Sequence, residues 1–226
     1  MRRLIGMLAL LLVAGCSTTR VVPVPGAGVV LDPGQRSATL AGDGVEVVVR
    51  PSVWRGSPSY LADYVTPFHL LVVNGSSLPL RYEYGDLRLF DEARFQYTAL
   101  PPAEVTRILR AAAVAAPADE IVVAGATSAL HRHRGPYYWD PWWWGPPFSP
   151  YYWPPPRYDD VLTQALPVGS LAAGARAQGF VYFPRLRPDA RRLTFEFHHR
   201  LGDAPRVLTL PLAVERAAAA PPRPTA

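Results

Sequence analysis

Short apolar segments, separated by gaps no longer than turns, are the feature of this sequence that most limits its fold. The segment 66–75 is a run of β-branched and apolar residues that stops at Asn74-Gly75, a pair typical of tight turns. In the segment 78–84, apolar residues alternate with Pro79, Arg81 and Glu83, which is the two-residue period of a half-buried strand. Such closely spaced extended segments predict antiparallel sheet rather than alternating strands and helices.

Further segments have the same extended character. A polar turn at 91–94 separates 86–90 from 95–100 and predicts a hairpin, and Gly202-Asp203 predicts the turn between the last two strands. The remaining strands are expected at 28–31, 45–50, 121–124, 178–183, 192–198 and 206–214.

Two helices are expected. Residues 101–113 favour a helix, because proline is tolerated in the first turn and Glu104 interacts favourably with the helix dipole. Asp159 and Asp160 are predicted to cap a second, brief helix that runs through Leu166.

About seven or eight short strands with little helix predict an all-β fold, namely an immunoglobulin-like antiparallel β-sandwich with one or two short helices. We expect the sandwich at 43–215, with an insert rich in proline and aromatic residues at 131–160 and a disordered tail at 216–226. Residues 16–42 combine small residues, prolines and glycines without a sustained period, so a flexible tether is predicted there.

The first residues follow the pattern of a signal peptide. Arg2 and Arg3 are followed by an apolar run at 4–14, which is too short to cross a bilayer as a permanent helix. The run leads into Val13, Ala14, Gly15 and Cys16, and Cys16 is the only cysteine of the chain. An ordinary secretory peptide followed by an incidental cysteine is the alternative interpretation.

This ending resembles the lipobox of bacterial lipoproteins, with Val13 where leucine is commoner. The resemblance implies cleavage after residues 1–15, a diacylglycerol on the thiol of Cys16 and acylation of the new amine. That covalent lipid would be the membrane anchor, and two or more acyl chains hold a protein stably where one would not. In the same family, a serine after the lipidated cysteine, here Ser17, is associated with delivery to the outer membrane. We expect the folded domain to lie on the periplasmic side of that membrane.

A second resemblance concerns the folded part. The segments 68–74, 86–91, 95–97 and 178–184 look like the immunoglobulin-like domains of uncharacterised exported bacterial lipoproteins. In those domains, a strand ending in Asn leads to a hairpin of the form Leu-x-Asp-x-x-Gly-x-x-Tyr, and a Gly-aromatic strand closes the sheet late in the chain. Ala93-Arg94 stands here where that hairpin would have glycine. The family implies no catalytic residues.

Composition narrows the possible partners. With Cys16 carrying lipid, no cysteine is left for a disulfide, so the fold depends on its buried core. The net charge of +5 comes entirely from arginine, because the chain has no lysine. These arginines are spread along the chain, so contact with anionic lipid headgroups is a better interpretation than nucleic-acid binding.

The segment 135–158 holds eleven aromatic residues, five of the six tryptophans and eight prolines. Aromatic faces stack on sugar rings or bind partner proteins, and indoles also settle at membrane interfaces. A low-complexity loop without a ligand is the third interpretation. The candidate binding residues are Tyr137, Tyr138, Trp139, Trp142, Trp143, Trp144, Tyr151, Tyr152 and Trp153.

Motifs for catalysis are missing from the sequence. It has no G-x-S-x-G elbow, no H-E-x-x-H and no phosphate loop. The histidines at His69, His131, His133 and the pair His198-His199 lack the cysteines or clustered carboxylates that would complete a metal site.

We therefore expect no enzyme, no metal and no cofactor beyond the lipid on Cys16. The predicted function is a lipid-anchored envelope lipoprotein with a structural or protein-interaction role. The alternative is a glycan- or peptidoglycan-binding module that uses the aromatic insert.

Overall fold

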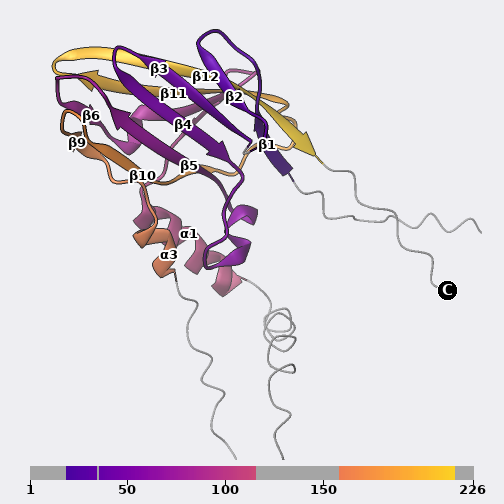
Figure 1. Ribbon diagram of the computed structural model, residues 1–226. Helices are drawn as coiled ribbons and strands as arrows, with labels where there is room; N and C mark the ends of the chain where they lie inside the picture. Colours follow the sequence, from indigo (N-terminus) through magenta and orange to yellow (C-terminus); the bar gives the residue numbers. More distant parts are fainter. Residues whose placement is uncertain (1–18, 35, 116–157, 217–226) are drawn as a thin grey trace, which may run out of the picture.

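The computed structural model describes residues 19–34, 36–115 and 158–216. In these residues, two antiparallel sheets pack face to face (Figure 1), so the predicted all-β sandwich is confirmed. The first sheet has the order β1 (Thr19–Pro23), β12 (Ala204–Arg216), β11 (Arg192–Leu201), β6 (Leu80–Tyr82) and β9 (Gly169–Leu171), while β7 (Leu87–Asp91) pairs with β11 and with β8 (Gln96–Thr98). The second sheet has the order β10 (Arg176–Pro184), β5 (Val65–Asn74), β4 (Val45–Pro51), β3 (Ser37–Gly42) and β2 (Val29–Asp32).

The core lies between the two sheets, because alternate residues of each strand point inward. In β4, the valines at 45, 47 and 49 are buried while Glu46 is exposed. Phe68 of β5 packs edge to face on Phe183 of β10, with ring centroids 5.2 Å apart, and Phe195 of β11 lies 6.2 Å from both rings. Aromatic rings from both sheets thus join the two layers.

The end of β5 is fixed by one buried side chain. Asn74 is fully buried, and its Nδ2 donates hydrogen bonds to the carbonyls of Leu78, Leu171 and Ala172 at 2.8, 3.1 and 3.1 Å. Its Oδ1 accepts from the backbone N–H and the hydroxyl of Ser76. The predicted end of the strand at Asn74-Gly75 is therefore confirmed, and Asn74 also connects this point to the end of β9 and to the residue after it.

The predicted tether at 16–42 is wrong for the part of it that is described. Residues 19–42 contain the strands β1, β2 and β3, and Val21, Ala38 and Leu40 are buried in the core. The sandwich therefore includes residues from Thr19 onward instead of beginning at residue 43. These strands are short and separated by turns, so no long period appears in the sequence, and β1 pairs with β12 at the other end of the chain.

Two other elements are shorter than predicted. The strand expected at 78–84 is limited to Leu80–Tyr82, because Glu83 begins the 3₁₀ turn η2 (Tyr84–Asp86) with a reciprocal capping box to Asp86. Helix α3 (Asp159–Thr163) also stops before Leu166. Its N-cap residue is Tyr158, which makes no side-chain cap, so the predicted capping by the two aspartates is wrong. The Asp160 carboxylate instead accepts a hydrogen bond from the backbone N–H of Ser57 at 2.7 Å.

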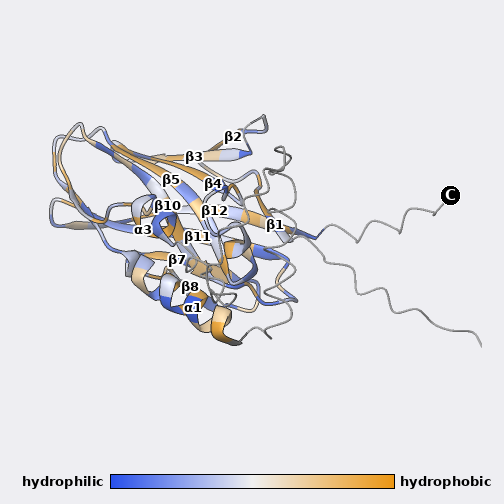
Figure 2. Ribbon diagram, turned by 90° about the horizontal axis from the view of Figure 1, so that it is seen from below, coloured by the Kyte–Doolittle hydropathy of each residue, from blue (hydrophilic) through white to orange (hydrophobic). Residues whose placement is uncertain are grey.

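Short helices cover the outer face of β10 and β5 (Figures 1 and 2). We call this the helical layer; it consists of the 3₁₀ helix η1 (Ser59–Asp63), α1 (Pro102–Ala115), which confirms the helix predicted at 101–113, and α3. A second apolar cluster, which includes Leu61, Val105, Leu109, Val161 and Tyr182, lies between the layer and the sheet. Because both faces of β10 are covered, five consecutive residues of it are buried.

Candidate functional site

Most of the residues that the sequence singles out lie outside the described residues. These are Cys16, His131, His133, the segment 121–124 and the nine aromatic candidates between Tyr137 and Trp153. The structure does describe where the chain leaves and re-enters on either side of the insert. It leaves at the end of α1 and returns at Tyr158, just before α3.

Tyr158 holds the return point in the helical layer. Its side chain is only 8% exposed and belongs to the same apolar cluster as Val105 and Leu109 of α1. The Arg110 guanidinium lies 5.9 Å from the centre of its ring. Burial and the neighbouring Tyr158 hydroxyl raise the pKa of Tyr60 to about 12. Both ends of the insert thus join one packed layer.

A cleft of about 840 Å³ opens at the end of the sandwich where Thr19 pairs with Arg216. We call it the terminal cleft, and we call this end of the molecule the terminal end. The start of β1, the end of β12, the start of β5 and the loop after β10 form its walls. The residues that line it are Thr19, Arg20, Val21, Ser52, Trp54, Ala62, Asp63, Val65, Thr66, Pro67, Arg185, Leu186, Pro188, Glu215 and Arg216.

Hydrogen bonds between separate segments hold the cleft walls in place. The backbone N–H of Val21 donates to the hydroxyl of Ser52 at 3.0 Å, which connects the edge strand of the first sheet to the second sheet. Arg216 donates from Nη2 to the carbonyl of Arg187 at 3.1 Å. The Trp54 indole donates from Nε1 to the carbonyl of Pro58 at 2.9 Å and packs 4.8 Å from the ring of Phe180. The cleft therefore forms part of the folded framework.

The cleft carries both signs of charge, with arginine in excess. Arg20, Arg185 and Arg216 line it together with Asp63 and Glu215. Within the described residues, none of these five side chains forms an ion pair. Guanidinium groups bind phosphate and carboxylate oxygens through paired hydrogen bonds, so such a cleft suits an anionic group.

Acidic residues next to the cleft are already engaged. Asp189 pairs with Arg187 at 2.8 Å, and backbone and Arg187 hydrogen bonds lower the pKa of the Asp189 carboxyl. The Glu92 carboxylate accepts hydrogen bonds from the backbone N–H groups of Arg191 and Arg192 at 2.9 and 3.2 Å. The pKa of the Glu92 carboxyl is lowered by a hydrogen bond from the backbone N–H of Glu92 itself and, to a smaller extent, by those from Arg191 and Arg192. Both carboxylates are therefore committed to loop structure.

The described histidines do not converge on one site. His198 lies on the outer face of β11 and contacts the Glu196 carboxylate at 2.7 Å, whereas His199 is buried and stacks on Phe197 with ring centroids 5.0 Å apart. His69 lies on β5 of the second sheet and packs against Phe180 of the neighbouring strand β10. Burial lowers the pKa of both His69 and His199. In the described part of the chain, no three histidine, cysteine or acidic side chains gather as a metal site would require.

The sequence does not predict the terminal cleft. Arg20 lies in the predicted tether, and Arg185 and Arg216 come from the opposite end of the chain, so only the folded topology brings them together. The alternation of buried Val21 with exposed Arg20 is the one local signal, and a single such step is too short to predict a strand.

No protein-family model, curated protein or solved structure matches the chain. None of the described helices is both long enough and apolar enough to span a membrane.

Proposed function

We propose that the protein is a bacterial envelope lipoprotein whose single sandwich, of immunoglobulin-like type, has a non-catalytic structural or protein-interaction role. In this proposal Cys16 carries the lipid anchor, the membrane is the outer membrane, and the domain lies on its periplasmic side. The support comes from the lipobox pattern before Cys16 and from Ser17 after it.

One structural observation is compatible with this proposal. Strand β1 begins at Thr19, three residues after Cys16, and all five of its residues pair with β12. The sequence thus changes from a short apolar run to folded sandwich within a few residues. A lipoprotein needs no longer segment between its lipidated cysteine and its domain, because the acyl chains supply the membrane attachment.

The helical layer gives the aromatic insert a fixed base. Its two described ends belong to α1 and to Tyr158, which share one buried cluster, so the sandwich presents whatever the insert binds. Tryptophan and tyrosine concentrate binding energy at protein interfaces. We assign the insert a partner-binding role, with another envelope protein as the partner.

Lipidation is tested by mass spectrometry of the protein purified from a bacterial membrane. The proposal predicts a mature chain starting at Cys16 with the added mass of a diacylglycerol and, in addition, an acyl group. The Cys16→Ala variant should leave the membrane fraction, while Ser17→Ala should stay in it. An unmodified thiol, or equal partition of Cys16→Ala and the parent protein, would overturn the proposal.

Glycan or peptidoglycan binding is the second candidate function, supported by the five tryptophans within 135–158. Titration with peptidoglycan fragments, followed by tryptophan emission, separates it from protein binding. Stacking on a sugar should shift the emission in the parent and leave a Trp142→Ala/Trp143→Ala/Trp144→Ala variant unresponsive. An unchanged spectrum up to millimolar ligand would exclude the glycan function for the fragments tested.

A further inference from the structure

The link between the proposed anchor and the fold is short. Thr19, the first residue of β1, comes three residues after Cys16, and three residues span at most roughly 11 Å when fully extended. The 13 residues of β12, by comparison, extend for about 43 Å along the sandwich. A lipid on Cys16 would therefore hold the terminal end near the headgroups, while the opposite end could lie several times farther away.

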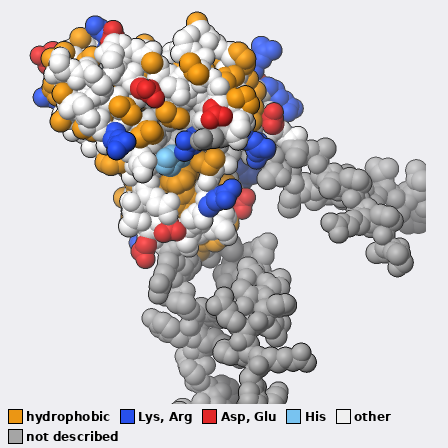
Figure 3. Space-filling view, in the orientation of Figure 1, with side chains coloured by type: hydrophobic (Ala, Val, Ile, Leu, Met, Phe, Trp, Pro, Cys, Tyr) orange, Lys and Arg blue, Asp and Glu red, His pale blue; other side chains and the backbone are white. Residues whose placement is uncertain are grey.

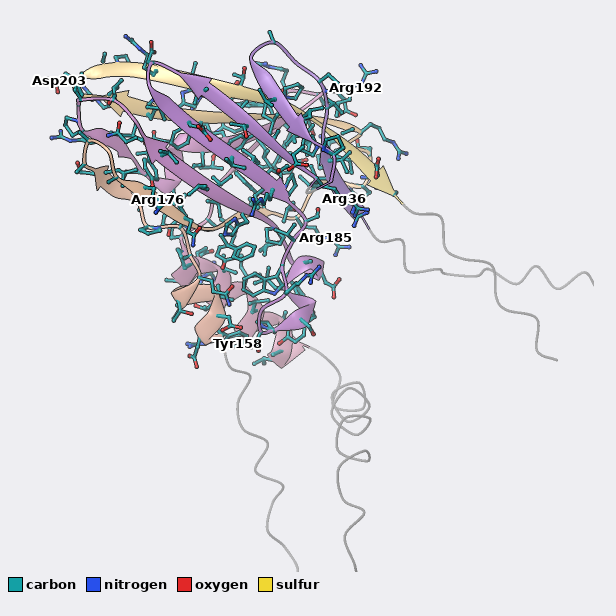
Figure 4. The ribbon with its side chains drawn as sticks, viewed as in Figure 1. Arg36, Tyr158, Arg176, Arg185, Arg192 and Asp203 are labelled. Carbon is teal, nitrogen blue, oxygen red and sulfur yellow. The ribbon has the colours of Figure 1, made fainter. Side chains whose placement is uncertain are left out.

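That end of the molecule is rich in arginine. Figure 3 shows arginine side chains gathered along the edge where the described chain begins and ends. Figure 4 places Arg36 and Arg185 at this end, and Asp203 at the opposite end of the sandwich. Arg20, Arg36 and Arg185 are all exposed, and none of the three forms an ion pair among the described residues.

The acidic residues of the terminal end offset these arginines only in part. Asp189 is paired with Arg187, and Glu92 is held by two backbone N–H groups. Asp63 and Glu215 remain in the terminal cleft, and Asp32 lies in the same β2–β3 hairpin as Arg36. Against these three acidic residues stand Arg20, Arg185 and Arg216 in the cleft and Arg36 outside it. An excess of guanidinium groups is thus available to an anionic surface.

We propose that the terminal end docks on anionic phospholipid headgroups of the membrane that holds the anchor, with Arg20, Arg36 and Arg185 contacting lipid phosphates. This inference rests on the lipid anchor proposed above. Guanidinium groups bind phosphate oxygens in pairs, and each arginine near an anionic surface strengthens the contact roughly fivefold. Because the anchor makes the contact intramolecular, a few such arginines suffice to orient the domain.

Orientation can be measured on the lipidated full chain in vesicles. Cys16 is the only cysteine and its sulfur carries lipid, so one introduced cysteine takes a fluorophore at a single place. Exposed Pro188, which lines the terminal cleft, and exposed Asp203, at the far end, are suitable positions for Pro188→Cys and Asp203→Cys. A quencher on the lipid headgroups then reports how close each label lies to the bilayer.

In vesicles of phosphatidylglycerol and phosphatidylcholine, the label at position 188 should be quenched several-fold more than the label at position 203. The difference should shrink in phosphatidylcholine alone and at about 1 M salt, where the screening length falls to about 3 Å. This salt titration needs no arginine variant. Equal quenching of the two labels, or a difference unaffected by lipid charge and salt, would overturn the docking.

Two charge-matched variants assign the contact to its residues. Arg20→Gln/Arg36→Gln/Arg185→Gln should reduce the difference between the labels to the level seen in phosphatidylcholine alone. Arg81→Gln/Arg176→Gln/Arg200→Gln changes three exposed arginines outside the terminal cleft and should preserve it. Equal effects of the two variants would overturn the docking. Failure of the labelled protein to enter either kind of vesicle, with an unmodified thiol, would instead overturn the lipid anchor itself.

Discussion

Arg94 has a backbone conformation that favours glycine, with φ at +64°. It lies in the turn between β7 and β8, where its N–H donates to the carbonyl of Asp91 at 3.0 Å. The hairpin that this segment resembles has glycine at this point, so the sequence departs from that pattern while the backbone keeps the corresponding conformation. The Arg94 guanidinium lies 5.3 Å from the centre of the Phe90 ring, a contact that offsets part of the strain.

We predict that Arg94→Gly is more stable than Arg94→Ala by about 1 kcal/mol. Both variants lose the contact with Phe90, but only glycine relieves a left-handed conformation that costs other residues roughly 1–2 kcal/mol. Urea unfolding of the two variants gives the difference in free energy. If the alanine variant were equally stable, the turn would not have the conformation described.

A second residue-scale prediction concerns pH. Burial lowers the pKa of His199 below its ordinary value of 6.5, with Arg206 and His198 adding to the effect and the Phe197 carbonyl and Asp43 opposing it. The unfolded chain therefore binds a proton at this residue before the folded protein does. The free energy of unfolding should fall as the pH drops below about 6.5, and continue to fall until the folded histidine is protonated.

Replacement of His199 by phenylalanine, which can keep the stacking on Phe197, should reduce this pH dependence. The measurement is the free energy of unfolding in urea at about pH 7 and about pH 5 for the parent and the variant. Part of the slope should remain, because burial also lowers the pKa of His69. An unchanged slope in the variant would contradict the buried, neutral state of His199.

At the scale of elements, Gly179 determines how closely β10 approaches the segment after α3. A Cβ at this position would lie 2.5 Å from the backbone N of Leu166 and 2.6 Å from the carbonyl carbon of Ala165. The next residue, Phe180, exchanges hydrogen bonds with this segment, donating to the Gln164 carbonyl at 2.7 Å and accepting from the Leu166 N–H at 2.9 Å. The backbone of residues 164–166 cannot move away from β10 without losing these hydrogen bonds.

Gly179→Ala should therefore destabilise the protein by about 2–3 kcal/mol, through overpacking of backbone against backbone. Gly85→Ala is the matched control, because a Cβ there meets nothing within 4 Å, and its effect should stay within about 0.5 kcal/mol. Urea unfolding midpoints of the two variants give the comparison. A mild effect at Gly179 would mean that β10 and the α3 segment are less tightly joined.

The strands that could be predicted are those whose period is visible in one stretch of sequence. Residues 45–50, 66–75, 178–183 and 192–198 alternate or run apolar over several residues. Three of these segments lie within strands, and 66–75 extends one residue past the end of β5. The strands within 19–42 could not be predicted in full, because each is only four to six residues long and β1 depends on pairing with the distant β12. Non-local pairing of this kind leaves little trace in local composition.

The candidate site, like the fold, has parts that the sequence predicts and parts that only the folded chain brings together. The resemblance to a lipobox and the aromatic insert each rest on one contiguous stretch of sequence, so both can be recognised without the fold. The terminal cleft combines Arg20 with Arg185 and Arg216, which only the sheet order brings together. The sequence predicts two of the three helices of the helical layer, α1 and α3, but not η1, and the contact of the layer with the outer face of β10 requires the fold.

At the scale of the whole molecule, the described chain has two separate points of exit. Thr19 and Arg216 pair at the terminal end, whereas the insert leaves at the end of α1 and returns just before α3, and Figure 1 shows these exits on different sides of the sandwich. A protein held at the terminal end would thus keep the base of its insert clear of the attachment point. This separation agrees with an anchor and a binding segment that act independently.

Independence of the insert predicts that the domain folds without it. Residues 116–157 can be replaced by a flexible linker of about 12 residues, whose ends lie roughly 20 Å apart on average. Helices α1 and α3 already share a buried cluster, and shortening the 42-residue connection should lower the entropy cost of closing it by about 1 kcal/mol. The free energy of unfolding should therefore stay the same or rise slightly.

Trp54 is the only tryptophan outside the insert, so in the deletion variant its emission reports on the helical layer alone. Its indole packs on Phe180 and is hydrogen-bonded to the Pro58 carbonyl, so a folded domain should give blue-shifted emission and one cooperative transition in urea. Capture of the envelope partner should be lost at the same time. A deletion variant that unfolds would show that the insert contributes to the core, and the reason for assigning it a binding role would disappear.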